Sequence, residues 1–547
     1  MFVRVKKSGN NQYLQIVENR REQGKTKQRV ISTIGRLERL QAKGDIETLV
    51  RSLSRFSEKV LMVLSGQSDP HTRAVKIGPT LIFERLWEQT GIKRILQGLL
   101  CDRKFQFNLE RAVFLTVLHR LFISGSDRYC DEWRRDYRIN GTEELSLHHL
   151  YRAMAFLGEE LNDQKAALPF SPRRIKDIIE EDLFRERRHL FSNLELVFFD
   201  TTSIYFEGNG GETIGRRGHS KDHRPDLKQM VVGVILDNNG CPLCCEMWPG
   251  NTTDIKTLVP VVKRMKKRFG IDRVIIVADR GMISKEVLSW LEKQDNNLEY
   301  ILGARMRQVV EIKRDVLSHG GRYQEVYPEG ITNKAPAPLK VKEVPVNGQR
   351  YIVCLNTKQA RKDAADRAAI LEALQQRLEQ QGAKSLVGNK GYRKYLKLAK
   401  GSVSINPDKV KYEERFDGKW VLRTNTTLSS RDVALKYKEL WQVEHIFRDM
   451  KSLMDTRPVF HQRDDTITGH VFCSFLALVL LKELKKRLSE AGYDFEWRKI
   501  RQDLKALQEI VIAEKEQQLV VRTECQGVSG KVFKAVRVAL PPTIRTL

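Results

Sequence analysis

Cysteine is too scarce and too scattered in this sequence to staple a secreted domain, because eight residues are spread over 547 positions without regular spacing. Cys241, Cys244 and Cys245 contain one Cys-x-x-Cys spacing, but no second pair completes a zinc site. Long hydrophobic runs are also missing, since the stretch Val471–Leu481 is about half the length that crosses a bilayer. The first residues lack an apolar signal core. We therefore expect a cytoplasmic protein with reduced cysteines and no membrane partner.

Acidic residues are fewer than basic residues. Asp and Glu number 69 against 96 Lys and Arg, which gives a formal net charge of +27 and an isoelectric point near 9.7. A surplus of this size, spread over many segments, indicates a polyanionic partner, most simply nucleic acid. A basic protein that is merely soluble is the alternative. The hydrophobic fraction of 41% is ordinary for a soluble chain, and the length allows three or four domains.

The first 190 residues predict two basic modules. Residues 1–44 carry short strand-like runs separated by Gly/Asn- and Lys-rich turns, which is typical of a basic β-meander. Residues 45–190 are predicted to form a helical DNA-binding domain, with Ser171-Pro172 as a helix start and arginine pairs such as Arg173-Arg174 away from the apolar stripes. The expected helices are Pro79–Leu99, Leu109–Ile123, Leu145–Leu161 and Ile175–Leu190.

Between residues 191 and 304 the pattern changes to alternating strands and helices. An apolar strand at 194–205 precedes two strands, Met230–Leu236 and Leu243–Trp248, that an Asp-Asn-Asn-Gly turn joins as a hairpin. The following elements are a helix, a strand, a helix and a strand at Asp254–Phe269, Arg273–Ala278, Ser284–Gln294 and Glu299–Gly303. This order predicts an α/β core that is ribonuclease-H-like.

A core of this kind needs one further helix, and in this sequence a long insertion separates that helix from the strands. Residues 305–425 are predicted to form a β-rich insertion domain that also contains a long polar helix, Ala360–Gln381. The missing helix follows at Ser430–Leu453, in a second core segment that spans residues 426–490. Residues 491–547 are predicted to form a helical C-terminal tail.

Asp200 is the first candidate functional residue. It lies in an apolar run predicted to be a strand buried on both faces, where a carboxylate without a partner is costly. Asp279 ends a second such strand, just before the Arg280-Gly281 turn. The two strands are neighbours in the predicted sheet, so the two carboxylates should meet. Because adjacent carboxylates repel, a shared Mg²⁺ or Mn²⁺ ion is the favoured compensation, although a lone aspartate here could instead cap a turn.

The third acid is expected on the late helix. Six residues recur at intervals of three, four and seven and so share one helix face: Tyr437, Leu440, Trp441, Glu444, Arg448 and Lys451. Taken alone, Glu444 and Arg448 could form an ordinary surface ion pair worth a few tenths of a kcal/mol. Beside two buried aspartates, Glu444 is the stronger candidate for a metal-binding acid.

These motifs resemble those of insertion-sequence transposases of the DDE type, in the group whose third acid lies in a Tyr-x₂-Arg-x₃-Glu-x₆-Lys motif. Tyr437, Glu444 and Lys451 match this spacing, whereas Leu440 stands at the arginine position and Arg448 could take its place. Other similar stretches are Phe-Phe-Asp-Thr-Thr at 198–202, Gly-Asn-Thr-Thr-Asp at 250–254, Ala-Asp-Arg-Gly at 278–281 and the loop at 218–226.

The resemblance implies a transposase that cuts and joins DNA, with Asp200, Asp279 and Glu444 as catalytic acids holding two Mg²⁺ or Mn²⁺ ions. It also implies double-stranded DNA as partner, both terminal inverted repeats and target, a homodimer in the DNA complex, and a prokaryotic, nucleoid-associated location. The residues expected to contact DNA are Tyr437, Arg448, Lys451, Arg217, Lys221, His223, Arg224, Lys228 and Arg280. For the five from Arg217 to Lys228, a solvated basic loop is the alternative.

Two other functions fit the same pattern. A ribonuclease-H-like nuclease would cleave DNA without joining it, and a regulatory protein would bind DNA with a site that no longer works. The presence of all three acids in the right order argues against the second. The first differs from a transposase in yielding no joined products.

Overall fold

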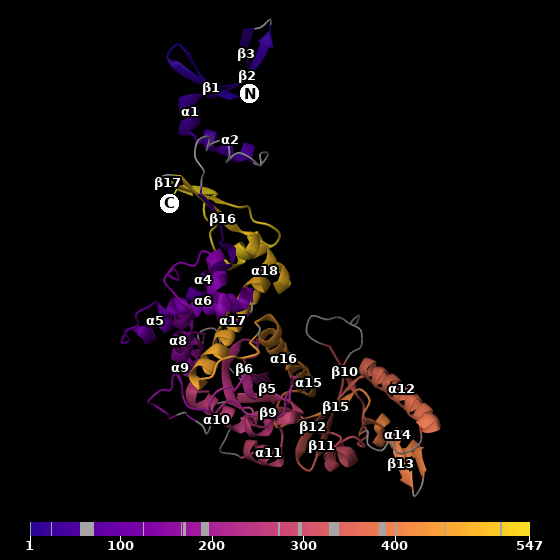
Figure 1. Ribbon diagram of the computed structural model, residues 1–547. Helices are drawn as coiled ribbons and strands as arrows, with labels where there is room; N and C mark the ends of the chain where they lie inside the picture. The colour runs from indigo at the N-terminus through magenta and orange to yellow at the C-terminus, as the bar shows by residue number, and fades with distance from the viewer. Residues whose placement is uncertain are drawn as a thin grey trace. The chain divides into compact units, whose positions relative to one another are not determined.

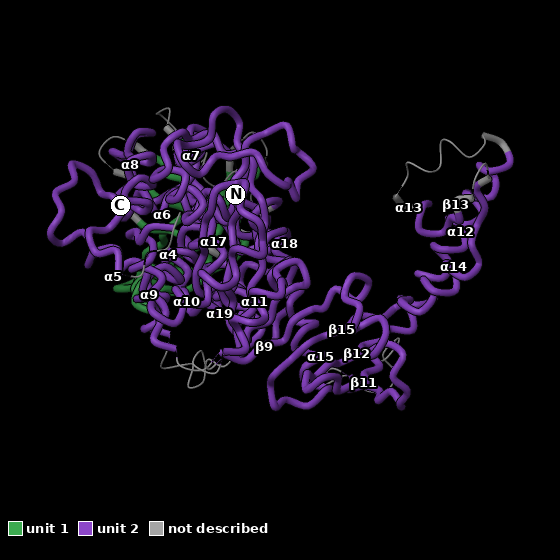
Figure 2. The backbone as a smooth tube through the Cα atoms, turned by 90° about the horizontal axis from the view of Figure 1, so that it is seen from below, with its two compact units in different colours: residues 1–73, 510–521, 544–547 green, residues 74–509, 522–543 purple. Residues whose placement is uncertain are grey.

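The computed structural model describes residues 2–22, 25–54, 71–123, 125–165, 167, 171–187, 196–271, 274–293, 298–327, 339–381, 390–399, 402–454, 456–514 and 517–546. The chain divides into two compact units, coloured separately in Figure 2. The first comprises residues 1–73, 510–521 and 544–547, and the second comprises residues 74–509 and 522–543. The ribbon in Figure 1 carries the element labels used below.

The first unit begins with a three-stranded antiparallel sheet in the order β1-β2-β3, where the sequence predicts a meander. Its elements are β1 (Phe2–Ser8), β2 (Asn11–Glu22) and β3 (Lys25–Arg36), followed by the helices α1 (Leu37–Ala42) and α2 (Asp45–Ser54). A four-stranded sheet has the order β18-β17-β16-β4, from strands β4 (His71–Lys76), β16 (Gln508–Glu514), β17 (Gln517–Arg522) and β18 (Ile544–Thr546).

These last strands correct the prediction of a helical C-terminal tail. Helices α18 (Trp497–Ala506) and α19 (Ser529–Val536) are present, but β16, β17 and β18 occupy much of the remaining tail. The short runs Ile510-Val511-Ile512 and Leu519-Val520-Val521 explain the difference, because β-branched residues favour strands. Pairing with β4, more than 400 positions earlier, completes this sheet.

The helical part of the second unit packs around one long central helix. Its members are α4 (Gly78–Gln89), α5 (Ile92–Leu100), α6 (Leu109–Phe122), α7 (Asp127–Trp133), α8 (Leu147–Leu157), α9 (Ile175–Arg187) and α17 (Asp464–Glu490). The predicted helix Pro79–Leu99 is divided into α4 and α5 at Gly91, whose φ of +83° interrupts the helix. Among the described helices, α17 is long and apolar enough to span a membrane, but 89% of its apolar window is buried inside the protein.

A mixed nine-stranded sheet forms the centre of the second unit, in the order β10-β11-β12-β15-β9-β8-β5-β6-β7 among the described strands. The predicted core corresponds to β5 (Leu196–Tyr205), β6 (Gln229–Leu236), β7 (Pro242–Pro249), β8 (Val274–Ala278) and β9 (Leu298–Gly303). β5 is antiparallel to β6 and parallel to β8, so the first and fourth core strands are neighbours, as predicted.

Both faces of this sheet are covered. Leu196 and Phe198 of β5 point into the core formed with α17, whereas Val197 and Phe199 point into a second core with α10 (Leu258–Phe269) and α11 (Lys285–Leu291). Burial on both faces is why the strand sequence shows no polar alternation. The predicted helix Asp254–Phe269 instead consists of a short 3₁₀ turn, Asp254–Lys256, followed by α10.

Most strands of the predicted β-rich insertion domain belong to the core sheet, and two form a separate two-stranded sheet. Its strands β10 (Gln324–Val326), β11 (Leu339–Val346), β12 (Gln349–Asn356) and β15 (Lys419–Thr424) extend the core sheet, because β15 pairs with β9. The remainder comprises α12 (Thr357–Gln381), α13 (Lys390–Arg393), β13 (Leu396–Ala399), β14 (Ser402–Ile405) and α14 (Pro407–Glu414). The late core helix follows as α15 (Ser430–Lys438) and α16 (Trp441–Arg448), with a turn between them.

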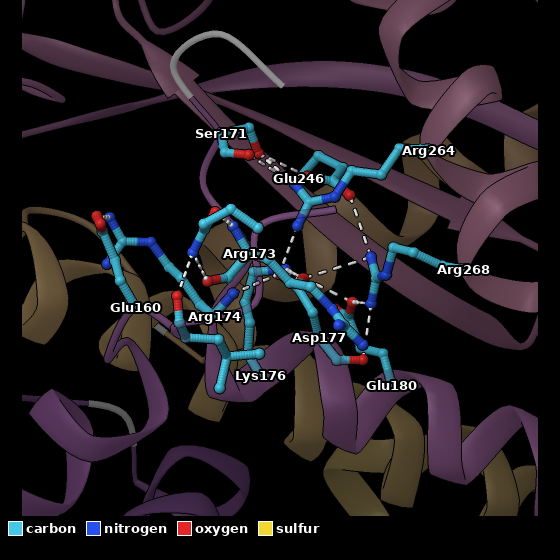
Figure 3. Close-up of polar contacts among 12 residues, drawn as sticks. Glu160, Ser171, Arg173, Arg174, Lys176, Asp177, Glu180, Glu246, Arg264 and Arg268 are labelled. Atoms are coloured by element: carbon cyan, nitrogen blue, oxygen red, sulfur yellow. Dashed lines mark hydrogen bonds and ion pairs between the residues drawn. The ribbon is translucent and has the colours of Figure 1, made fainter. Parts of the chain in front are cut away.

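A buried network of ion pairs joins α9 to β7 and α10 (Figure 3). Asp177 is at its centre, with Lys176 Nζ at 2.7 Å, Arg268 Nη1 at 3.3 Å and Arg264 also in contact. The cations are Lys176, Arg264 and Arg268, joined at the edge by Arg173, and the acids are Asp177, Glu180, Glu181 and Glu246. Because opposite charges balance, these groups can be buried together.

The same network corrects two expectations about residues 171–174. Ser171 does not start a helix, since its hydroxyl donates to Glu246 at 3.0 Å and α9 begins later. Arg173 and Arg174 do not lie on a solvent-facing side: Arg173 pairs with two acids, and Arg174 is 8% exposed and pairs with Glu160 at 2.9 Å. Sequence periodicity does not reveal these partners because they come from other segments.

Candidate active site

Asp200 and Asp279 lie side by side at one edge of the sheet. In the parallel pairing of β5 with β8, Phe199 is opposite Ala278. The residue that follows each of them is an aspartate, so Asp200 and Asp279 are neighbours. Both line a cavity of about 500 Å³, together with Glu444 from α16. The three acids singled out from the sequence are therefore brought to one place, although they are far apart along the chain.

Asp200 is held in a partly desolvated position. Its Oδ1 accepts a hydrogen bond from the backbone N–H of Thr201 at 2.7 Å. Burial raises the pKa of Asp200 to about 6; Lys221 and the Thr201 hydrogen bond oppose this, whereas the negative charges of Asp279 and Asp254 add to it. A positive charge placed between these acids would favour the ionised form.

Asp279 is held by Tyr437 of α15. The phenol O–H donates to Asp279 Oδ1 at 3.0 Å, and burial followed by the nearby carboxylate raises the pKa of Tyr437 well above its usual range. Gly303, at the end of β9, makes this contact possible. A Cβ at position 303 would lie 2.3 Å from the Tyr437 oxygen, so a larger residue would displace the phenol from the aspartate.

The predicted single helix is divided into α15 and α16, and residues of both helices and of the turn between them line the cavity. Tyr437, Leu440, Trp441 and Glu444 all line it, and Leu440 is only 7% exposed. The Tyr-x₂-Arg-x₃-Glu-x₆-Lys motif has arginine at this position, but the buried environment here suits an apolar side chain. Arg448, one turn beyond Glu444, is exposed and does not belong to the cavity wall.

Lys451 has a different environment from the one expected. Its ammonium group is 2.7 Å from Asp222 Oδ1, and Arg457 contacts the same carboxylate. Burial lowers the pKa of Lys451, and the Asp222 contact partly offsets this. Lys451 thereby links the loop between β5 and β6 to the end of the late helix. In this structure the Lys451 ammonium group, which we predicted to contact DNA, is paired with Asp222.

The other predicted DNA contacts fall into three groups. Arg280 lines the cavity, whereas Arg217, His223 and Arg224 are exposed on the loop between β5 and β6. Arg224 is also paired with Asp226 at 2.8 Å. Lys228 and Lys221 point back to the protein. Lys228 Nζ donates to the Asn209 carbonyl at 2.9 Å, and Lys221 Nζ donates to the Thr201 carbonyl at 2.7 Å.

Two family comparisons match this architecture. The sequence matches the family described as the transposase DDE domain over residues 192–480, which is more than half of the chain and includes all three acids. The chain belongs to the DDE transposases. Residues 3–69 of the transposase also match the N-terminal domain of the IS1634 family of transposases, so it is an insertion-sequence enzyme that cleaves DNA and transfers strands.

Two further comparisons are weaker. A solved structure of the piggyBac transposase in a synaptic complex with hairpin DNA aligns with 78% of this chain and 78% of its own. The identity is 11% and the TM-score is 0.36, a likeness too weak to establish a shared fold. A comparison with curated proteins finds no match to the transposase sequence.

Several residues at the transposase site are not among those proposed from the sequence. Asp254 contacts Lys221 at 3.2 Å and Thr201 at 2.6 Å, beside Asp200. The Gly-Asn-Thr-Thr-Asp stretch at 250–254 was the available signal, but its place next to β5 depends on the fold. Lys419, Trp420 and Lys438 also line the cavity, and the first two come from β15 within the insertion.

DDE transposase domains use divalent metal ions, and the donor set in the cavity suits them. Asp200, Asp279 and Glu444 offer hard carboxylate oxygens, the ligands that Mg²⁺ and Mn²⁺ prefer. Asp127, His461 and His470 also place ligand atoms within 4.8 Å of one another, elsewhere in the second unit. There, however, Arg120 Nη2 lies 2.9 Å from His470 Nδ1 and occupies its lone pair, so this group fits a metal poorly.

Proposed function

We propose that this transposase binds the terminal inverted repeats of its element and cuts and joins DNA at a site where Asp200, Asp279 and Glu444 hold two divalent ions, Mg²⁺ or Mn²⁺. The observation that carries the proposal is that these three acids line one cavity. When bound, such a pair of ions supplies activation of the attacking hydroxyl and stabilisation of the departing oxygen in displacement at phosphorus.

The surrounding residues support this chemistry. Tyr437 donates a hydrogen bond to Asp279 Oδ1 and so fixes the orientation of this carboxylate. Arg280, Lys419 and Lys438 line the same cavity and supply positive charge suited to the phosphates that flank a cleaved bond. Trp441, 55% exposed at this wall, offers a flat apolar surface next to Glu444.

A path for DNA is proposed from the cavity across the loop between β5 and β6. Arg217, His223 and Arg224 are exposed on this loop, and Arg448 is exposed on α16 beyond Glu444. These side chains would contact phosphates and position the duplex without reading its sequence. Joining two element ends in one reaction further suggests a homodimer in the DNA complex.

The decisive experiment uses a DNA fragment that carries the terminal repeats of the element, a target plasmid and Mg²⁺. The variants Asp200→Asn, Asp279→Asn and Glu444→Gln should each lose cleavage and joining while keeping DNA affinity. Glu439→Gln is the matched control, because this acid lies in the turn just before α16 and outside the cavity wall. Full cleavage by the three variants would show that the site is elsewhere, and cleavage without joined products would indicate a nuclease instead.

A further inference from the structure

A lysine and a fourth acid are built into the edge of the proposed metal site. Lys221 comes from the loop between β5 and β6, and its ammonium group has three partners. These are the Thr201 carbonyl at 2.7 Å, the Thr201 hydroxyl at 3.0 Å and Asp254 Oδ2 at 3.2 Å. The two contacts to Thr201 are hydrogen bonds, and the contact to Asp254 is an ion pair.

The arrangement is closed and pre-formed. The Thr201 hydroxyl donates to Asp254 Oδ1 at 2.6 Å while it accepts from Lys221, so the three side chains form a triangle. The backbone of Lys221 is also anchored, because its N–H donates to the Ser203 hydroxyl at 2.8 Å. The side chains of Lys221 and Asp254 are 31% and 29% exposed, so solvent screens this ion pair less than one on the open surface.

This triangle is adjacent to the proposed metal ligands. Thr201 directly follows Asp200, and Lys221 Nζ contacts both the carbonyl and the hydroxyl oxygen of Thr201. Asp254 Oδ2 and Asp279 Oδ2 are each 3.9 Å from the position that a Cβ on Gly281 would take. One cation therefore lies among the acids Asp200, Asp254 and Asp279, where a divalent ion is also expected.

We propose that Lys221 is a built-in counter-ion of the acidic site, held in place by Asp254, and that it lowers the affinity of the DNA-free enzyme for divalent metal. This inference rests on the proposed function, since it assumes that Asp200 and Asp279 bind metal. Lys221 and Asp254 are positioning residues here: Asp254 acts through Lys221, and Lys221 acts on the acids by its charge.

The test measures Mn²⁺ binding to the full-length, DNA-free protein by the loss of the free-ion signal in electron paramagnetic resonance. Lys221→Met should raise Mn²⁺ affinity on the order of tenfold, because a positive charge near the ion is removed. Lys256→Met is the control, since this exposed lysine loses the same charge just two residues from Asp254. Lys221→Arg restores the charge and should bind Mn²⁺ within about threefold of the original protein.

Asp254→Asn tests the anchor. In that background Lys221 loses its ion pair and keeps only its contacts to Thr201, so its position is less fixed and adding Lys221→Met should change Mn²⁺ affinity less than about threefold. If Lys221→Met binds Mn²⁺ like Lys256→Met, or if Lys221→Arg binds like Lys221→Met, the counter-ion role is wrong. A tenfold effect of Lys221→Met that persists in Asp254→Asn would overturn the anchoring role.

The outcomes also separate this inference from the proposed function. If the original protein binds no Mn²⁺, or if Asp200→Asn and Asp279→Asn bind it unchanged, the metal site itself is misplaced. If those two variants lose binding while Lys221→Met matches its control, the metal site stands and only the counter-ion role fails. Circular dichroism of each variant shows whether the fold is retained.

Discussion

Removing the charge of Asp177 should destabilise the second unit more than most single substitutions. The Asp177 side chain is fully buried and contacts three cations, Lys176, Arg264 and Arg268. Asp177→Asn keeps the shape and an oxygen for the hydrogen bond from the Arg174 backbone N–H, which is 2.8 Å long. It removes the charge, replaces one acceptor oxygen by an amide NH2 group that faces a buried cation, and leaves the buried cations with one acid fewer.

The expected cost follows from this burial. Breaking a buried ion pair by removing one partner costs about 3–5 kcal/mol, because the remaining charges stay desolvated. Typical domains have only roughly 5–15 kcal/mol of stability, so this loss is a large fraction of the total. The loss should appear as an earlier transition in urea unfolding followed by tryptophan fluorescence and circular dichroism.

The control is Asp226→Asn, which removes the same charge from an ion pair with Arg224 in which both side chains are about half exposed. That variant should leave the midpoint unchanged, since solvent screens exposed pairs. Combining Asp177→Asn with Arg264→Met restores the charge balance and should cost less than the sum of the single changes. If Asp177→Asn unfolds at the same urea concentration as Asp226→Asn, the network does not hold α9 against the sheet as argued.

Three further predictions concern the site, acid stability and DNA binding. Gly303→Ala should lower DNA cleavage about tenfold to a hundredfold by displacing Tyr437 from Asp279, whereas Gly320→Ala, with open space around its Cβ, should cleave normally. Burial and the neighbouring Arg120 lower the pKa of both His119 and His470 from 6.5 to about 4. Since the unfolded chain then binds more protons between these pH values, each histidine should cost up to about 3 kcal/mol of stability as the pH falls from 6.5 to 4. His119→Gln should flatten that loss in thermal unfolding across this pH range, and an unchanged slope would contradict the assignment. Because the protein has a formal net charge of +27, the logarithm of its DNA affinity, measured by fluorescence anisotropy, should fall steeply and linearly with the logarithm of the salt concentration. An affinity that does not change with salt would rule out mainly electrostatic binding.

The sequence determined the elements that carry the acids. The apolar runs before Asp200 and Asp279 predicted strands buried on both faces, and the structure has both. The spacing of Tyr437 and Glu444 predicted one helix face; the structure divides this helix into α15 and α16, and both residues line one cavity. These inferences succeeded because burial on two faces and helical periodicity are local properties, visible in a few consecutive residues.

Tertiary structure decided the partners of the charged groups. Lys221 and Lys451 looked alike as basic residues near the site, yet one meets Asp254 and the other Asp222. Likewise, strands β10, β11, β12 and β15 of the insertion extend the core sheet because β15 pairs with β9. Such pairings depend on which distant segments the fold brings within a few ångströms, and neither charge nor periodicity in the sequence encodes that distance.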